Sequence, residues 1–363
     1  MEEWRTGKLA VTYAGCFLGA GFVSGQELRQ FFGVFGLAGW VGFVLAAGLF
    51  FLLGVLLVRL TQLSGIYEMD TVLIPWDVPW LRNAVGVLEA VFLFGMVAVM
   101  TAGAGALAGQ LTGVPAPLFG AIFGAAVAAA AMAGLRGMVR VFSALVPLLA
   151  GATVCFAAAA WVRFGGASLS FAGENTNPLM PNWFIAALTY VAYNLLGSVG
   201  ILTPVGALVK RPKTVYTGIG LACLLLCAIA GSVLASMAVC PAAASAELPM
   251  LALGCLLSPA LGKVYGVLLL LGMFGNALAS LVALTTYLGQ KKASLQAHGK
   301  SLTAGLGALA WAGSLAGFAG LIGTVFPVFG YLSIVLLGCM VIHFVQCRRR
   351  GKTGGAADGE ADG

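Results

Sequence analysis

The residues best suited to bind a ligand lie in the stretch Gly15–Glu27, whose sequence is GCFLGAGFVSGQE. Four glycines fall within Gly15–Gly25, and each costs a helix about 0.5–1 kcal/mol relative to alanine. Gly19 and Gly21 face different sides of a helix, so one close helix contact does not explain both. Non-helical backbone inside a bilayer needs hydrogen-bond partners, and a bound solute or ion can supply them. The spacing predicts a first span that is interrupted near Gly19–Gly21 and binds a small solute or ion there. The alternative is a continuous helix with two small-xxx-small packing pairs.

The composition places this stretch in a membrane protein. Of 363 residues, 61% are hydrophobic and 9% are charged, and the mean hydropathy is +1.02. These values exclude a soluble globular domain. The N-terminal segment shows no small-residue cleavage pattern, so we expect it to remain as an uncleaved first span. Function must then reside among the membrane spans.

The apolar runs predict ten membrane-spanning helices, since one span takes about 20 residues. They cover residues 9–32, 38–60, 83–109, 116–134, 140–162, 182–209, 214–239, 264–290, 302–322 and 325–346. With the N-terminus inside, every lysine and arginine except Arg29, Arg163 and Lys263 lies on the cytoplasmic side, as the positive-inside rule requires. We therefore expect a multi-pass protein of the bacterial cytoplasmic (inner) membrane with both termini in the cytoplasm. Residues 61–81 are expected to form an interfacial cytoplasmic loop. The net charge of +7 follows from this topology and argues against nucleic-acid binding.

A weak internal repeat pairs the third and eighth spans. Residues 85–110 and 265–290 share Gly-Val-Leu, Phe-Gly and Gly-Gln at matching positions. Five spans per repeat give two halves of opposite orientation, as in many secondary transporters. The predicted organisation is a first five-helix repeat at 1–162, an external loop at 163–181, a second repeat at 182–346 and a disordered cytoplasmic tail at 347–363.

The repeat predicts that the sixth span is interrupted like the first. Its middle contains Asn194, Gly197, Ser198, Gly200 and Pro204, and proline in a helix interior costs about 3 kcal/mol. A proline-kinked but continuous helix is the alternative. Paired interruptions at corresponding positions of two halves indicate a transporter's binding site.

Two motifs, GAGFVSGQE in the first span and WFIAALTYVAYN in the sixth, make the chain resemble the YkvI-like family of bacterial membrane proteins over essentially its whole length. That family is similar to the amino acid–polyamine–organocation superfamily of transporters. The resemblance implies an all-α polytopic membrane protein with ten transmembrane helices in a 5+5 inverted repeat of the LeuT type. Its first and sixth helices are expected to be discontinuous.

The resemblance also implies a substrate site at the two interruptions. In the superfamily, backbone N–H groups at the first interruption bind a substrate carboxylate, and helix N-termini favour such anions. The matching substrate-binding positions here are Gly19, Ala20, Gly21, Phe22 and Ser24 in the first span and Tyr190, Tyr193, Asn194 and Ser198 in the sixth. Phe22 is expected to act as a gate or wall.

The expected coupling ion is sodium or a proton. Sodium-coupled relatives hold an ion between first-span carbonyls and adjacent hydroxyl residues of the eighth span, whereas this chain has Asn276 and Ser280 there, which argues against sodium. Glu89 is the candidate proton-binding residue, because it lies about 10 Å into the third span at 1.5 Å per residue. A side chain that snorkels to the inner surface is the alternative. Glu27 and Arg29 are two residues apart, do not face each other on a helix, and are expected to line an outer vestibule.

These features favour a secondary active transporter that moves a small polar solute, such as an amino acid or another small carboxylate or amine, by alternating access. The alternative is a transport-inactive membrane scaffold or sensor that retains the fold. An enzyme is not expected, because two histidines and scattered carboxylates form no catalytic cluster. The cysteines show no metal spacing, although Cys240 and Cys255 could pair. The expected partners are the lipid bilayer and the solute, with no cofactor beyond Na+ or H+ as coupling ion, and the sequence does not indicate an oligomeric state.

Overall fold

The fold is described from a computed structural model, which covers residues 5–165, 178–244, 246, 248–315 and 318–357. Every secondary-structure element in these ranges is a helix. The elements are α1 (Thr6–Phe17), α2 (Ala20–Ser24), α3 (Gln26–Phe31), the 3-10 helix η1 (Gly33–Phe35), α4 (Leu37–Ser64), α5 (Met69–Leu73), α6 (Pro79–Thr112), α7 (Ala116–Ala131), α8 (Gly134–Phe164), α9 (Trp183–Gly206), α10 (Pro212–Val239), α11 (Pro241–Ala244), α12 (Pro249–Leu257), α13 (Pro259–Lys291), α14 (Ala293–Ala297), α15 (Gly299–Ser314) and α16 (Phe318–Ala357).

Within the described part of the chain, seven helices are long and apolar enough to cross a membrane. They are α4, α6, α8, α9, α10, α13 and α16. The other predicted spans are shorter, because α7 and α15 have 16 residues each and the first apolar run is divided among α1, α2 and α3. The all-helical, multi-pass architecture expected from the hydropathy is therefore confirmed.

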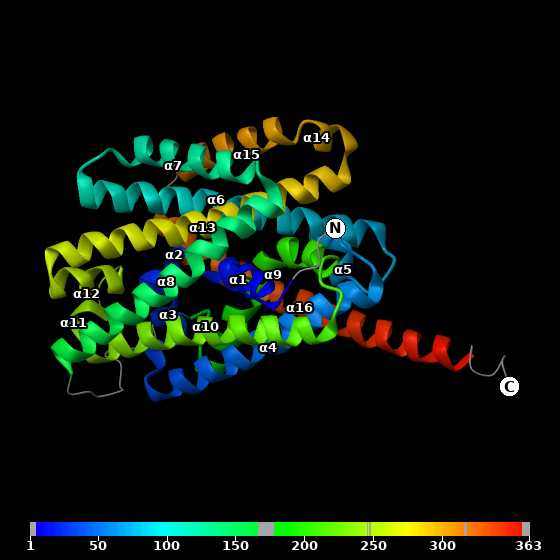
Figure 1. The fold of residues 1–363 in the computed structure, drawn as a ribbon, viewed down its shortest axis with the longest axis horizontal. Helices are drawn as coiled ribbons and strands as arrows, with labels where there is room; N and C mark the ends of the chain where they lie inside the picture. The colour runs from blue at the N-terminus through cyan, green and yellow to red at the C-terminus, as the bar shows by residue number, and fades with distance from the viewer. Residues whose placement is uncertain (1–4, 166–177, 245, 247, 316–317, 358–363) are drawn as a thin grey trace.

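The long helices surround α1 and α9, which lie near the middle of the bundle (Figure 1). Helix α1 packs against α8 and α10, α4 packs against α9, and α13 packs along α6. Helices α7 and α15 lie side by side against α6, where the Trp311 indole N–H donates to the Pro117 carbonyl at 2.9 Å. Helix α16 extends out of the body and continues to Ala357, past the start of the predicted tail at 347 (Figure 1). Residues 358–363 and most of the predicted loop 163–181 lie outside the described ranges.

Helix α9 is continuous, so the predicted interruption of the sixth span is wrong. Its small residues serve close packing instead. A Cβ on Gly197 would lie 3.1 Å from the Phe92 ring, and one on Gly200 would lie 2.8 Å from the Ala283 Cβ. Pro204 lies two residues before the end of the helix at Gly206, and its missing N–H leaves the Gly200 carbonyl without that intrahelical donor but does not interrupt the helix. The glycines therefore bring α9 close to α6 and α13 without unwinding it.

The pairing of Cys240 with Cys255, which the sequence left open, does not occur. Both are free thiols, and Cys240 is buried whereas Cys255 is exposed. The Cys255 sulfur lies directly on Gly262, at the place where a Cβ would project. It therefore serves the contact between α12 and α13.

Candidate functional site

The first span leaves helical geometry between α1 and α2. Helix α1 ends at Phe17, and Leu18 (φ −77°, ψ 61°) and Gly19 (φ −86°, ψ 176°) are not helical. A second change of direction occurs at Gly25, which separates α2 from α3 with φ +82°. This left-handed conformation is costly for a residue with a Cβ, which explains a glycine there. The interruption lies beside the predicted positions Gly19–Gly21.

Polar side chains of α13 support the backbone on both sides of this interruption. The Tyr265 hydroxyl donates to the Val23 carbonyl at 2.7 Å, and the Asn276 amide Nδ2 donates to the Cys16 carbonyl at 3.5 Å. Gly19 packs against the same amide, since a Cβ there would lie 2.9 Å from Nδ2. Backbone carbonyls freed from a helix inside a membrane need such partners. Helix α13 therefore holds the broken segment in place.

We expect Tyr265→Phe to lower the stability of the protein by about 1–3 kcal/mol, because it leaves the buried Val23 carbonyl without its donor. Thermal unfolding of the purified protein in detergent measures the change. The control is Tyr216→Phe on the exposed face of α10, which should stay within about 0.5 kcal/mol of the parent. Equal melting temperatures for the two variants would contradict this assignment.

Glu27 lies inside the protein, so its predicted place in an outer vestibule is wrong. Its side chain is 9% exposed, and Oε2 accepts a 2.7 Å hydrogen bond from the Tyr193 hydroxyl. The carboxylate lies directly on Gly21, where a Cβ would overlap with Oε1. The turn at Gly25 separates α2 from α3, so the side-chain directions of one continuous helix do not apply to Glu27. Arg29 remains half-buried.

No described lysine, arginine or histidine forms an ion pair with Glu27. An ionised carboxylate in a protein interior is costly unless a charge or several hydrogen bonds compensate it. The site beside the interruption therefore contains a buried acidic group whose only side-chain hydrogen bond among the described residues comes from a tyrosine.

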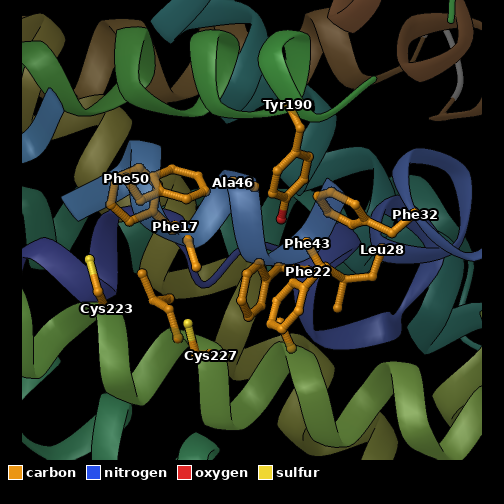
Figure 2. A pocket seen from close by; sticks show the side chains of 13 residues that line it. Phe17, Phe22, Leu28, Phe32, Phe43, Ala46, Phe50, Tyr190, Cys223 and Cys227 are labelled. Atoms are coloured by element: carbon orange, nitrogen blue, oxygen red, sulfur yellow. The ribbon is translucent and has the colours of Figure 1, made fainter. Parts of the chain in front are cut away.

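An apolar cavity adjoins the interruption on the side of α4 and α10. Phe17 and Phe22 line it from either side of Leu18–Gly19 (Figure 2). The remaining lining residues are Leu28, Phe32, Phe43, Ala46, Ala47, Phe50, Tyr190, Cys223, Leu226, Cys227 and Ala230. The cavity has about 20 Å³ of free space, which is room for about one water molecule.

The Tyr190 hydroxyl gives this cavity a polar group. Figure 2 shows it pointing into the space between the phenylalanine rings. The residue is buried, and its hydroxyl has no hydrogen-bond partner within the described ranges. Its ring contacts those of Phe31, Phe32, Phe50 and Tyr193 at centroid distances of 5.1 to 6.0 Å. Aromatic rings with one hydrogen-bonding group suit an apolar or cationic ligand with a polar end.

Comparison with known proteins identifies the fold. No family model matches the chain. The uncharacterized membrane protein YkvI of Bacillus subtilis (strain 168) is 25% identical over 345 residues, which cover 94% of this chain and 97% of YkvI. The resemblance to YkvI inferred from the two motifs is confirmed.

Solved transporter structures superpose on almost the whole chain. A substrate-bound Na+-coupled sialic acid symporter has a TM-score of 0.73 at 11% identity and covers 94% of this chain and 79% of its own. The chain has the LeuT-type fold. MhsT in complex with L-phenylalanine matches with a TM-score of 0.66 at 18% identity, covering 95% of this chain and 89% of its own. Mhp1, a nucleobase-cation-symport-1 family transporter, matches with a TM-score of 0.65 at 18% identity, covering 94% of this chain and 78% of its own.

Several predicted site residues of this LeuT-type chain bond to their own backbone. The Asn194 amide donates to the Tyr190 carbonyl at 2.9 Å, and the Ser198 hydroxyl donates to the Leu195 carbonyl at 2.7 Å. The Ser24 hydroxyl donates to the Gly21 carbonyl at 3.3 Å and accepts from the Gln26 N–H. The Ala20 side chain lies outside the described part of the structure. The structure thus brings Gly21, Phe22, Tyr190 and Tyr193 together with Glu27. The side chains of Ser24, Asn194 and Ser198 are hydrogen-bonded to backbone carbonyls of their own helices.

The predicted ion-coupling residues lie at two separate places. Asn276 and Ser280 are buried on α13 near the first span, and the Asn276 amide already donates to a first-span carbonyl. Glu89 is 2% exposed on α6, so it does not snorkel to the surface.

Sequence reasoning missed Asp70, which belongs to the presumed loop 61–81. Asp70 is fully buried on α5 and forms a 2.6 Å ion pair with Lys291 of α13. The acidic residues Glu68 and Asp70, close before the apolar residues 72–74, were the available signal for this cluster.

Proposed function

We propose that the protein is a secondary active transporter that moves a small solute carrying an amino group, by alternating access around the broken first span. The observation that carries this proposal is the buried Glu27 carboxylate, which lies on Gly21 at the interruption and bonds to Tyr193. In this proposal α1–α3 form the first of ten spans, and α7 and α15 complete the set. Transport, rather than a scaffold or sensor role, accounts for a broken helix next to a small apolar cavity.

The charge of Glu27 selects the chemistry of the solute. A buried carboxylate that lacks a basic partner among the described residues is stabilised by a ligand that brings a positive charge. A solute carboxylate at Gly21 would meet the carboxylate of Glu27 and be repelled. Helix α2 has five residues, which is too short for its N-terminus to compensate that repulsion. The expected contact of Gly19–Gly21 with a substrate carboxylate is therefore replaced in this proposal by an ammonium contact with Glu27.

The aromatic cavity supports an apolar remainder for the same solute. Phe22 and Tyr190 line the cavity, and both adjoin the Glu27 site. Phe22 follows Gly21 in the chain, and the Tyr190 ring contacts the Tyr193 ring. An ammonium group is attracted to aromatic faces as well as to a carboxylate. Since the cavity has room for about one water molecule, a solute enters only when the lining helices separate. Such a change is what alternating access requires.

A thermal-shift experiment with three probes tests the solute class. Phenylethylamine has an ammonium group, 3-phenylpropionate has a carboxylate, and L-phenylalanine has both. We expect the two ammonium compounds to raise the melting temperature and 3-phenylpropionate to leave it unchanged. At a ligand concentration of a hundred times Kd, binding adds about 2.7 kcal/mol to the free energy of unfolding. Stabilisation by 3-phenylpropionate alone would contradict the proposal.

Glu27→Gln is expected to abolish the response to both ammonium compounds, because the neutral amide keeps the shape but loses the charge. The matched control is Glu68→Gln, since Glu68 lies near Lys291 at a distant, half-exposed position. Uptake of radiolabelled phenylethylamine into proteoliposomes provides the second measurement. Stabilisation without uptake would favour a sensor that retains the fold.

A further inference from the structure

A second polar cluster lies at the end of α6 and α13 that the topology assigns to the cytoplasm. It consists of Glu68 and Asp70 from the start of α5, Glu89 from α6, and Tyr287 and Lys291 from α13. The site at the broken first span uses none of these residues. The cluster therefore requires an explanation of its own.

An ion pair connects this cluster to the solvent. The Lys291 Nζ lies 2.6 Å from Asp70 Oδ2 and 3.3 Å from Glu68 Oε2. The Tyr287 hydroxyl donates to the same Asp70 oxygen at 3.5 Å. Asp70 is fully buried, whereas the side chains of Lys291 and Glu68 are 34% and 44% exposed. The ion pairs of Lys291 thus connect the buried Asp70 with the partly exposed Glu68 at the surface.

Glu89 forms the inner end of the cluster. Neither of its carboxylate oxygens has a hydrogen-bond partner among the described residues, and the side chain is 2% exposed. Asp70 and Tyr287 both converge on Gly86, where a Cβ would overlap with the Tyr287 hydroxyl and lie 3.1 Å from the Asp70 Cβ. Gly86 and Glu89 are three positions apart on α6 and therefore share one face of the helix. The side chains of Asp70 and Tyr287 thus pack against the face that carries Glu89.

The charges around Glu89 come from three elements. Helix α5 contributes Asp70, which interacts electrostatically with Glu89, and Glu68 lies farther out at its N-cap. Helix α13 contributes Tyr287 and Lys291. His343 of α16 lies behind α5, with Nδ1 2.8 Å from the Val72 carbonyl.

Lys291 pairs with Asp70 and Glu68, and no ion pair among the described residues compensates Glu89. With Lys291 paired to Asp70, an ionised Glu89 adds an uncompensated negative charge to the interior. A bound proton removes this charge. A metal ion fits less well, because an ammonium group already occupies the cluster and no group of three metal-binding side chains occurs in the described ranges.

We propose that Glu89 is the binding site of the coupling proton, and that Asp70 and Lys291 form its exchange route to the cytoplasm. This inference rests on the proposed transport function and supplies its driving ion. The proton bound to a Glu89 oxygen passes by way of Asp70 to water at the exposed Lys291 end, and no electrons are transferred. Asp70 relays the proton, and Lys291 is a positioning residue that acts through its ion pair with Asp70.

Infrared difference spectroscopy tests proton binding without any solute. A protonated carboxylic acid has its own C=O stretching band, which disappears when the acid ionises. We expect a pH-dependent band in the purified protein that is absent in Glu89→Gln and present in Asp77→Asn, since Asp77 is exposed and pairs with Arg82 outside the cluster. An unchanged band in Glu89→Gln would overturn the proposal.

The role of Lys291 has a separate readout in the same spectra. We expect Lys291→Gln to change the pH at which the Glu89 band is half lost, and Lys291→Arg to restore the original value, because only the charge is needed. A purely structural lysine would affect folding in both variants and leave that pH unchanged. Such a result would remove Asp70 and Lys291 from the exchange route.

Proteoliposomes containing a pH-sensitive dye connect the proton to transport. With phenylethylamine as the probe, Glu89→Gln should lose solute-dependent proton movement and retain exchange of labelled for unlabelled phenylethylamine. Loss of proton movement alone supports the proton site. Phenylethylamine-dependent uptake of radioactive sodium without proton movement would overturn it. If the parent protein neither binds nor exchanges phenylethylamine, the proposed solute class fails, and the infrared band still decides the proton site.

Discussion

Gly21→Leu is expected to abolish solute uptake while leaving the protein folded and inserted in the membrane. The Glu27 side chain occupies the place where a Cβ at position 21 would project, so any larger residue displaces it. The displaced carboxylate loses its 2.7 Å hydrogen bond from Tyr193 and its position beside the interruption. Because the displaced atoms belong to a flexible side chain, the backbone of α2 need not move. The loss should therefore fall on binding rather than on folding.

Uptake of radiolabelled phenylethylamine into proteoliposomes measures this effect, and gel filtration of the purified variant verifies folding. Gly48→Leu is the matched control, because a Cβ at Gly48 on the exposed face of α4 meets no atom within 4 Å. Should Gly21→Leu fail to fold, the smaller change Gly21→Ala makes the same test. Normal uptake by a folded Gly21 variant would show that the solute binds elsewhere.

Gly39→Ala is expected to have the largest effect on stability. Gly39 lies at the start of α4, and a Cβ there would overlap with the carbonyl oxygen of Phe32. This neighbour is backbone, so it cannot rotate away as a side chain does. Overpacking of this kind costs about 1–3 kcal/mol and occasionally more. The shift also moves the Phe32 ring, which contacts Tyr190 at 5.1 Å and lines the aromatic cavity.

Thermal unfolding in detergent, together with the yield of membrane-inserted protein, measures the effect of Gly39→Ala. Gly48→Ala on the same helix is the control, because its side chain projects into open space. It should leave the stability unchanged or raise it by up to about 1 kcal/mol, as alanine favours a helix over glycine. If Gly39→Ala and Gly48→Ala have the same melting temperature, the close contact between α4 and the Phe32 carbonyl does not contribute to stability.

The sequence predicted the fold well because hydropathy and glycine content act locally. Four glycines in one apolar segment made a continuous first helix costly, and the chain does leave helical geometry at Leu18–Gly19. The same reasoning failed for α9. Glycine permits either unwinding or a close helix contact, and Gly197 and Gly200 provide contacts with Phe92 and Ala283. Composition alone cannot distinguish these uses.

The site was predicted less completely because its decisive contacts join distant residues. Glu27 was expected outside because of the helical directions of its neighbours, but Gly25 ends that helix before Glu27 is reached. The hydrogen bond from Tyr193 crosses 166 positions, and the ion pair of Lys291 with Asp70 crosses an even larger separation. No periodicity or spacing within one sequence reports such pairs.

The paired helices α7 and α15 have a consequence for the surrounding lipid. Each has 16 residues, which at 1.5 Å per residue gives about 24 Å, less than the hydrocarbon thickness of about 30 Å. In the ten-span topology proposed above, lipid beside this pair thins locally or leaves helix ends mismatched, at a fraction of a kcal/mol per Å. The protein should therefore gather in thinner regions of a mixed bilayer, and its turnover should rise as acyl chains are shortened.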